Sequence, residues 1–149
     1  MILNRQRAVR VARVPLEAFL RRVGDELNLG DSDVTVCLVS DAEIARMNEA
    51  FRKKKGPTDV LSFPAESAEG AEKSRRGPGS RSTETYLGDI AIAPATARRY
   101  AKKNGRSLNN ELRVLILHGV LHLLGYDHES DRGEMDRFEQ KMRRRFGLA

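Results

Sequence analysis

The sequence predicts an α/β fold with α+β character, in which a small mixed sheet of about four strands packs against about five helices. Three observations lead to this prediction. Short β-rich runs are grouped toward the N-terminus, segments of helical periodicity dominate the C-terminal half, and no internal repeat or second hydrophobic block interrupts them. A chain of 149 residues is also the size of one domain. We therefore expect a single domain over residues 1–149.

A strand and a helix are predicted in the first part of the chain. Val9 and Val11 alternate with arginines, a pattern that fits an edge strand. Pro15 follows where a helix would begin, because proline is tolerated in the first turn. Apolar residues then recur at helical spacing over residues 16–27, and this periodicity predicts an amphipathic helix.

The next segment is predicted to be strand, helix and strand. Residues 34–39 are rich in β-branched side chains and predict a second strand. Ser40, with Glu43 three residues later, is typical of a capping box and starts a helix. The apolar face expected for this helix consists of Ile44, Met47 and Phe51. Residues 60–63 predict a third strand, which Pro64 closes.

Residues 65–85 are expected to form a mobile loop, because Gly, Ser, Pro and charged residues dominate and apolar periodicity is absent. A fourth strand is expected over residues 86–93. It contains Asp89, a carboxylate in an otherwise apolar run. This side chain either supports a functional site from behind or caps neighbouring backbone groups.

Three helices are predicted in the C-terminal part. Pro94 opens the first, which ends at Asn104 and Gly105, and Ser107 caps the second, which stops at Gly125. The last helix covers about residues 132–146. Its inward face is expected to carry Met135, Phe138 and Met142.

The composition favours a cytoplasmic protein. The formal net charge is +6, and the single cysteine, Cys37, excludes an intramolecular disulfide and is most simply a buried, inert thiol. The N-terminus is punctuated by arginines and lacks the apolar run of a secretory signal. The longest apolar stretch, residues 114–117, is far shorter than the roughly 20 residues of a membrane helix, so we expect no membrane association.

All three histidines of the chain lie in one 11-residue segment, HGVLHLLGYDH. His118 and His122 are four residues apart, so on a helix their imidazoles lie one turn apart on the same side. Gly125 allows a sharp turn, after which His128 can return toward the same point. Three neutral imidazoles form the protein half of a catalytic zinc site, which lowers the pKa of a bound water toward about 7. Ordinary polar residues at a helix end are the alternative, and nickel, copper and iron also suit imidazole.

The spacing H-x3-H-x5-H is also that of the zinc ligands in the metzincin proteases. Those enzymes place a glutamate general base directly after the first histidine, where this chain has Gly119. The ligand pattern therefore favours a metal site without favouring peptidase chemistry. Asp127, beside His128, is a base, a partner that orients an imidazole, or an ordinary turn residue.

With this histidine segment and two others, the chain resembles the YbeY family of bacterial metal-dependent endoribonucleases. The other two segments are FRKKKGPTDVLSFP at residues 51–64 and LGDIAI at residues 87–92. Met135 and Glu139 also fit the helix that follows the family's histidines. The resemblance implies a zinc-dependent, single-strand-specific endoribonuclease that acts in 16S rRNA 3′-end maturation and ribosome quality control. The implied partners are single-stranded RNA, rRNA and the small ribosomal subunit, and no DNA.

The resemblance also implies which residues form the site. One Zn²⁺ ion per chain would be held by His118, His122 and His128. The family's functional arginine corresponds to Arg52, whose guanidinium suits phosphoryl oxygens because it stays charged and can bind two of them at once. Lys54, in the same basic turn, adds positive potential, although a solvated helix end gives the same pattern.

Basic residues on two later helices permit an RNA partner, because such charge binds phosphates without sequence preference. They are Arg98, Arg99, Lys102, Lys103, Arg106, Arg143, Arg144 and Arg145. Aromatic residues make up only 5% of the chain, so base-stacking surfaces are expected to be sparse.

Two other functions stay open. One is a metalloprotease-like hydrolase of a non-RNA substrate, although Gly119 argues against peptides. The other is a non-catalytic ribosome-assembly factor with a structural metal. Structural zinc sites are closed by four protein ligands, usually including cysteine, and Cys37 is far along the chain. For Ser62 and Thr58 the sequence leaves a substrate contact undecided.

Overall fold

The computed structural model describes residues 1–30, 33–65, 86–127 and 131–148. Its centre is a mixed four-stranded sheet in the order β1-β2-β4-β3. The strands are β1 (Ile2–Asn4), β2 (Val34–Leu38), β3 (Val60–Pro64) and β4 (Gly88–Ile92). β2 runs parallel to β1 and β4, whereas β3 pairs antiparallel with β4 at an edge of the sheet. The predicted small mixed sheet is confirmed.

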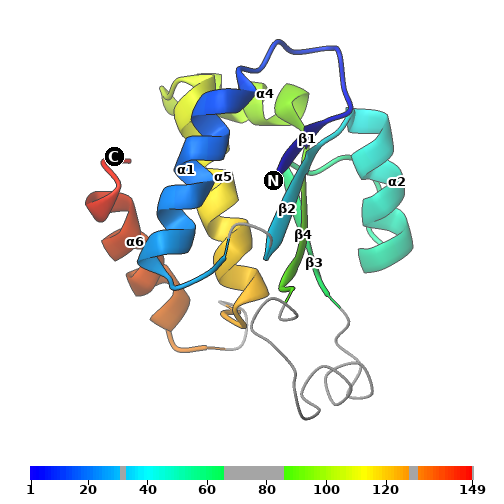
Figure 1. Ribbon diagram of the computed structural model, residues 1–149. Helices are drawn as coiled ribbons and strands as arrows, with labels where there is room; N and C mark the ends of the chain where they lie inside the picture. The colour runs from blue at the N-terminus through cyan, green and yellow to red at the C-terminus, as the bar shows by residue number, and fades with distance from the viewer. Residues whose placement is uncertain (31–32, 66–85, 128–130, 149) are drawn as a thin grey trace.

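Five helices of the described chain cover this sheet. They are α1 (Arg13–Glu26), α2 (Asp41–Arg52), α4 (Pro94–Asn104), α5 (Leu108–Leu123) and α6 (Glu134–Arg145). Helices α1, α5 and α6 lie on one side of the sheet and α2 lies on the other, while α4 lies near the end at which β4 finishes (Figure 1). The single α/β domain expected from the sequence is therefore present, with helices on both sides of the sheet.

The main core lies between the sheet and α5, which is buried on most of its surface. Ile90 of β4 faces this core, and its neighbour Ala91 faces a smaller cluster beneath α2, because successive side chains of a strand point to opposite faces. Burying a side chain such as Ile90 contributes roughly 1.5–3 kcal/mol. The region of α5 that carries the histidines is thus held firmly against β4 and β3.

The helix boundaries follow the predicted caps. The Ser40 hydroxyl accepts a hydrogen bond from the Glu43 backbone N–H at 3.1 Å, and the Ser107 hydroxyl accepts one from the N–H of Asn110 at 3.1 Å. Gly105 ends α4 in the left-handed conformation at φ 69°. These local signals were sufficient to predict where α2, α4 and α5 begin or end.

The position predicted for the N-terminal strand is wrong. β1 is formed by Ile2–Asn4, which pairs with β2 at the edge of the sheet, and residues 9–11 are not a strand. Instead, the Gln6 side chain accepts a hydrogen bond from the Val9 N–H at 3.0 Å and donates one to the Val9 carbonyl at 2.9 Å. A glutamine thus satisfies the backbone groups that a strand neighbour would otherwise pair.

The apolar face predicted for α2 is correct only in part. Ile44 is fully buried and Met47 is half-buried, but Phe51 is 67% exposed.

Of the expected loop at 65–85, residues 66–85 lie outside the described part of the chain. No helix in the described ranges is both long and apolar enough to cross a membrane.

Candidate metal centre and nucleic-acid cleft

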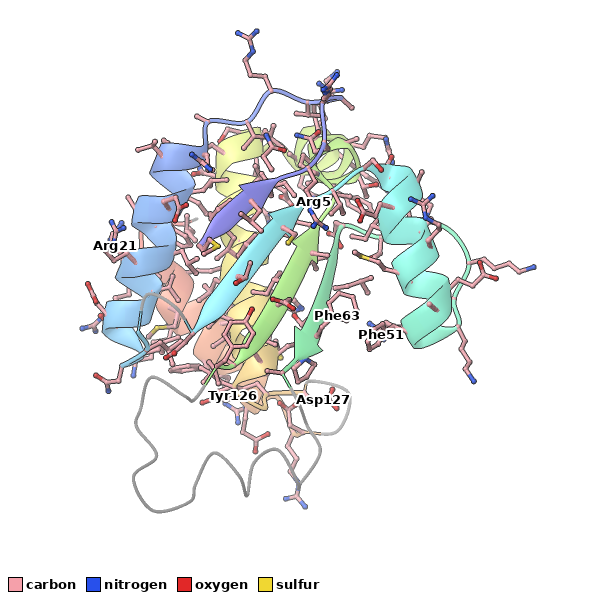
Figure 2. The ribbon with its side chains drawn as sticks, turned by 45° about the vertical axis from the view of Figure 1, so that its right-hand side comes forward. Arg5, Arg21, Phe51, Phe63, Tyr126 and Asp127 are labelled. Atoms are coloured by element: carbon pink, nitrogen blue, oxygen red, sulfur yellow. The ribbon has the colours of Figure 1, made fainter. Side chains whose placement is uncertain are left out.

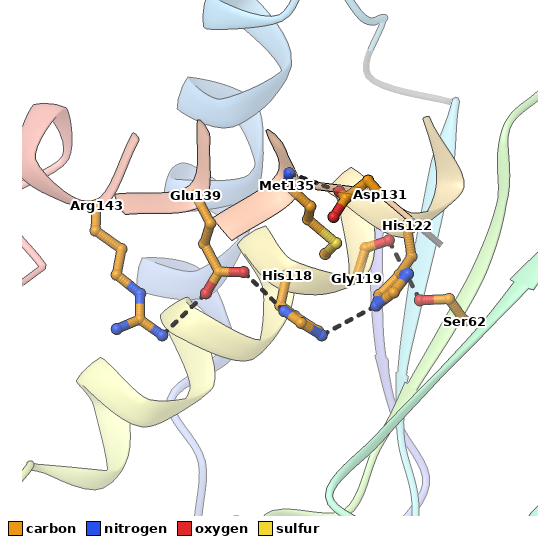
Figure 3. A network of polar contacts seen from close by, with 8 residues as sticks. All are labelled: Ser62, His118, Gly119, His122, Asp131, Met135, Glu139 and Arg143. Carbon is orange, nitrogen blue, oxygen red and sulfur yellow. Dashed lines mark hydrogen bonds and ion pairs between the residues drawn. The ribbon is translucent and has the colours of Figure 1, made fainter. Parts of the chain in front are cut away.

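Helix α5 brings His118 and His122 together near its C-terminal end. Their Nε2 atoms lie 3.1 Å apart, and the ring centroids are separated by 4.6 Å with the rings inclined by 78° (Figure 3). The one-turn spacing makes this approach possible, because side chains four residues apart stack on one side of a helix. Two ring nitrogens therefore converge on a common point.

Glu139 of α6 orients His118 from the other side of its ring. Its Oε1 lies 2.8 Å from Nδ1 of His118, and its Oε2 lies 2.9 Å from the Arg143 guanidinium (Figure 3). Burial raises the pKa of Glu139, but the hydrogen bond and charge of His118 and the charge of Arg143 outweigh it and hold the pKa below its usual value. An ionised carboxylate only accepts hydrogen bonds, so Nδ1 carries the proton. In the neutral imidazole, Nε2 then presents its lone pair toward His122.

This arrangement fits a metal ion. Two imidazole nitrogens at about 2.0–2.1 Å from a tetrahedral ion lie about 3.3 Å apart, close to the 3.1 Å between the two Nε2 atoms. A metal-bound histidine also normally donates its other N–H to a carboxylate, as His118 does to Glu139. Within the described ranges no three His, Cys, Asp or Glu side chains form a metal site. The third expected ligand, His128, lies outside the described residues.

Gly119, between the two histidines, has no room for a side chain. A Cβ atom there would lie 2.8 Å from Cδ1 and 2.9 Å from Cγ2 of Ile90, which is fully buried. The carbonyl of Gly119 accepts a hydrogen bond from the Ser62 hydroxyl at 3.2 Å, which ties β3 to α5 (Figure 3). The glutamate that metzincins carry at this position therefore does not fit this packing. Ser62 is half-buried and, besides this hydrogen bond, lines the cleft that contains the histidines.

A cleft of about 530 Å³ runs along β3 and includes both histidines. Arg52 from the end of α2 lines the same cleft, as does Asp127 from the turn after α5. Tyr126 and Asp127 lie below the end of β3, and Phe51 and Phe63 lie beside it (Figure 2). The structure thus brings together Arg52, Asp127 and two of the three predicted ligands, although they come from different elements.

The end of α2 carries a group of exposed cations, Arg52 and the three lysines after it, of which Arg52 lines this cleft. Lys53 adopts the left-handed conformation at φ 56° and ends the helix directly after Arg52. The buried side chain of Asn48 donates a hydrogen bond to the Gly56 carbonyl at 3.0 Å, which holds the following turn against α2. Among the described residues, Arg52 and the three lysines after it have no acidic partner.

Two other candidate residues lie elsewhere. Lys54 is exposed in the turn after α2 and is not among the described residues that line the cleft. Asp89 is exposed on the face of the sheet that is opposite to Ile90 and α5, and it accepts a hydrogen bond from the Tyr86 hydroxyl. The structure therefore does not bring Asp89 to the histidines. Nor does it show Asp89 capping backbone groups.

The lone thiol also lies away from the cleft. Cys37 is half-buried on β2 and packs against the cluster beneath α2. Burial raises the pKa of its thiol, and the positive charge of Arg5 offsets only part of this effect. A protonated thiol on this face of the sheet is a weak nucleophile and is not placed as a ligand beside His118.

Reasoning from the sequence missed two carboxylates. Glu139 received no role, although a glutamate between the inward-facing Met135 and Met142 was a signal of a buried acid. Asp59 lines the cleft, and burial raises its pKa, with the Glu111 carboxylate adding to the effect. No signal in the sequence separates Asp59 from an ordinary residue before a strand.

Several of the basic residues on the later helices are already paired within the fold. Arg106 lies 2.6 Å from the buried Glu111, and Arg143 lies 2.9 Å from Glu139. Arg99 and Arg145 also contact carboxylates, those of Asp41 and Glu26. The turn after α2, whose cations have no acidic partner among the described residues, is therefore a more direct candidate for phosphate binding than α4 or α6.

Comparison with known proteins gives one consistent family. The family model for Endoribonuclease YbeY matches residues 1–147. A protein named Endoribonuclease YbeY from Solibacter usitatus is 43% identical over 136 residues, which cover 91% of this chain and 80% of the relative. Another from Koribacter versatilis is 38% identical over 148 residues, covering 99% and 86%. A solution structure of a Thermotoga maritima protein is similar with a TM-score of 0.57 at 29% identity, covering 95% of this chain and 85% of that one.

Proposed function

Since the chain belongs to the YbeY endoribonuclease family, we propose that it is a metal-dependent endoribonuclease specific for single-stranded RNA. Its proposed substrate is rRNA of the small ribosomal subunit in the cytoplasm. The proposed roles are 16S rRNA 3′-end maturation and ribosome quality control. The proposed cofactor is one Zn²⁺ ion held by His118, His122 and His128.

The observation that carries this proposal is the convergence of two histidine nitrogens in the cleft that Arg52 also lines. Imidazole pairs with an orienting carboxylate are typical of catalytic metal sites, and an arginine beside them suits a phosphodiester. When bound, a zinc ion supplies Lewis acidity, which polarises phosphoryl oxygens and lowers the pKa of water. Each feature alone has an ordinary structural explanation, but together they match the needs of phosphodiester hydrolysis.

Three side chains have separate roles in the proposed reaction. The guanidinium of Arg52 binds the non-bridging oxygens of the scissile phosphate and offsets the negative charge that grows there. Glu139 keeps the proton of His118 on Nδ1, so that Nε2 stays available as a ligand. Asp127 lines the cleft with its carboxylate and accepts the proton that the attacking water loses.

The test combines metal analysis with cleavage of a ribosome-derived RNA. We expect His118→Ala to lower the bound metal, and we expect Arg52→Glu to retain metal and folding but to lose cleavage. Arg98→Glu on α4 is the matched control, because it reverses an exposed arginine away from the cleft. This control should cleave nearly as fast as the wild type.

Three outcomes would count against the proposal. If Arg52→Glu cuts RNA as fast as the wild type, the role given to Arg52 is wrong. Activity that survives both Arg52→Glu and His118→Ala belongs to a co-purifying nuclease, and a non-catalytic assembly factor is then the better description. A wild-type protein that binds no metal would remove the proposed ligand set.

A further inference from the structure

Phe51 is an exposed aromatic residue at the end of α2, one position before Arg52. Its side chain is 67% exposed, although the helical spacing predicted it to be buried with Ile44 and Met47. A single exposed apolar side chain is common on protein surfaces and needs no explanation by itself. The surroundings of Phe51 therefore decide whether its exposure has a function.

The aromatic ring lies at the cleft that contains the histidines. Phe51 and Phe63 both line this cleft, and both also line an adjoining hollow of about 500 Å³ beneath Arg46. The two rings lie beside each other between the end of α2 and β3 (Figure 2). Phe51 thus stands on the boundary between the candidate metal centre and a neighbouring surface.

Neighbouring groups hold the Phe51 ring in place but cover only part of it. Phe63 meets Phe51 with a centroid distance of 4.4 Å and an interplanar angle of 66°, an edge-to-face contact of the kind that stabilises aromatic pairs. The backbone after Phe51 is held by the hydrogen bond from the buried Asn48 to Gly56. The ring is therefore positioned by the fold while most of its surface stays accessible.

Cations follow Phe51 at the end of α2, whereas Asp89, the cross-strand neighbour of Phe63, brings a carboxylate to the adjoining hollow. Arg52 and the three lysines after it are exposed, and no described acidic residue pairs with them. Surfaces that bind single-stranded nucleic acids combine an aromatic ring, on which a base stacks, with cations that bind the adjoining phosphates. The end of α2 carries both groups within two consecutive residues.

We propose that Phe51, supported by Phe63, stacks on one unpaired base of the RNA while Arg52 binds an adjoining phosphate. This inference rests on the proposed function and adds a base-binding subsite to it. Stacking on a protein ring requires a base outside a duplex, so the subsite favours single strands. It tolerates all four bases, because each has an aromatic face.

The first measurement is the affinity for short single-stranded RNA, followed by fluorescence anisotropy before cleavage. We expect Phe51→Ala to weaken binding roughly 5- to 100-fold, as removal of a stacking ring does. Phe51→Trp and Phe51→Tyr should restore binding, whereas Phe51→Leu, which keeps apolar bulk without a ring, should not. Tyr100→Ala on α4 is the control, since Tyr100 is also an exposed aromatic residue but does not line the cleft.

The second measurement places the base. RNAs carrying 2-aminopurine at successive positions should show quenching at one position with the wild type and lose it with Phe51→Ala. An abasic nucleotide at that position should weaken binding to the wild type and not to Phe51→Ala, because both changes remove the same contact. Thermal melting of each variant separates a loss of stacking from a loss of folding. If Phe51→Ala does not fold, Phe51→Leu and Phe51→Trp decide the question.

Different results would overturn the stacking subsite and the endoribonuclease function on which it rests. If the wild type cleaves RNA and Phe51→Ala binds and cleaves equally well, the stacking subsite is wrong and the endoribonuclease proposal stands. An equal loss in Tyr100→Ala, or an abasic penalty that persists in Phe51→Ala, also overturns the subsite. A wild type that neither binds nor cleaves RNA overturns both.

Discussion

The two ring nitrogens of His118 face different partners, so each nitrogen has its own role. Nδ1 lies 2.8 Å from a carboxylate oxygen of Glu139, while Nε2 faces Nε2 of His122 at 3.1 Å. Two lone pairs at this distance would repel, so without a metal one of the Nε2 atoms must share a proton with the other. A cation that replaces this proton satisfies both nitrogens. The geometry of the pair is thus compatible with a shared proton and with a bound cation.

The contact between Glu139 and His118 predicts how zinc affinity depends on this carboxylate. Glu139→Ala removes the acceptor that fixes the His118 ring, so we expect zinc affinity to fall about 10- to 100-fold. Glu139→Gln keeps an acceptor and loses only the charge, so its loss should be smaller. Chelator-competition titration measures both variants, with the exposed Asp136→Asn on the same helix as the control. Unchanged affinity in Glu139→Ala would mean that Glu139 does not orient the site.

At the scale of elements, the close approach of α5 to β4 positions the histidines. Gly119 lets the helix backbone come near Ile90, and the Ser62 hydroxyl binds the Gly119 carbonyl from β3. The same contact leaves the outer side of α5 facing the cleft. A helix pushed away from the sheet would move both imidazoles relative to Arg52, which is carried by α2.

Gly119→Ala tests this packing. Alanine favours a helix over glycine by about 1 kcal/mol, but its Cβ would approach Ile90 to 2.8 Å. Overpacking of a filled core costs about 1–3 kcal/mol, so we expect a net loss of stability in urea unfolding. Ile90→Val removes the nearest methyl group and should recover part of the loss in the double variant. Strictly additive effects would show that the two side chains do not clash.

Asp41 links α2 to α4 and predicts a pH dependence. Its carboxylate accepts hydrogen bonds from Thr96 at 2.8 Å and Arg99 at 3.0 Å. Burial raises the pKa of Asp41, but these bonds and the Arg99 charge outweigh it and lower the pKa below its usual value. A lowered pKa in the folded state means that the carboxylate stabilises the fold above the unfolded pKa of about 3.9. This contribution is lost as the pH falls through the folded value.

We therefore expect Asp41→Asn to destabilise the protein by about 0.5–1 kcal/mol at pH 7, a small effect because the pair is partly solvated. The difference from the wild type should shrink below about pH 4, where the native carboxylate also takes up a proton. Urea unfolding across this pH range measures both free energies. Asp25→Asn, on an exposed position of α1, is the control. A difference that stays constant with pH would exclude the ionised link.

For the whole molecule, metal binding and stability should be linked, because Glu139 of α6 orients His118 of α5 only when the two helices are packed together. An ion present at 100 times its dissociation constant adds about 2.7 kcal/mol. For a domain of this size, that corresponds to an increase of about 5–10 °C in Tm. Thermal melting with and without zinc measures the increase, and His118→Ala should abolish it. An equal increase in His118→Ala would place the ion elsewhere.

Much of the fold was predictable because it depends on local signals. The caps at Ser40 and Ser107 and the spacing of His118 and His122 are short-range features, and each is present as expected. The errors fall where specific side-chain contacts override the simple pattern of apolar residues. Gln6 binds the backbone at Val9 in place of a strand neighbour, and Phe51 contacts Phe63 on the edge strand β3 but stays largely exposed.

Local patterns along the chain were enough to predict the element order, the helix ends and the pairing of two imidazoles one helical turn apart. Which other groups meet them follows from the packing of the elements, because Arg52, Glu139 and Phe63 lie on three different ones. Their approach depends on the antiparallel pairing of β3 and on α6 packing beside α5. Spacing along the chain sets contacts within one helix, whereas contacts between elements follow from how apolar faces are buried together.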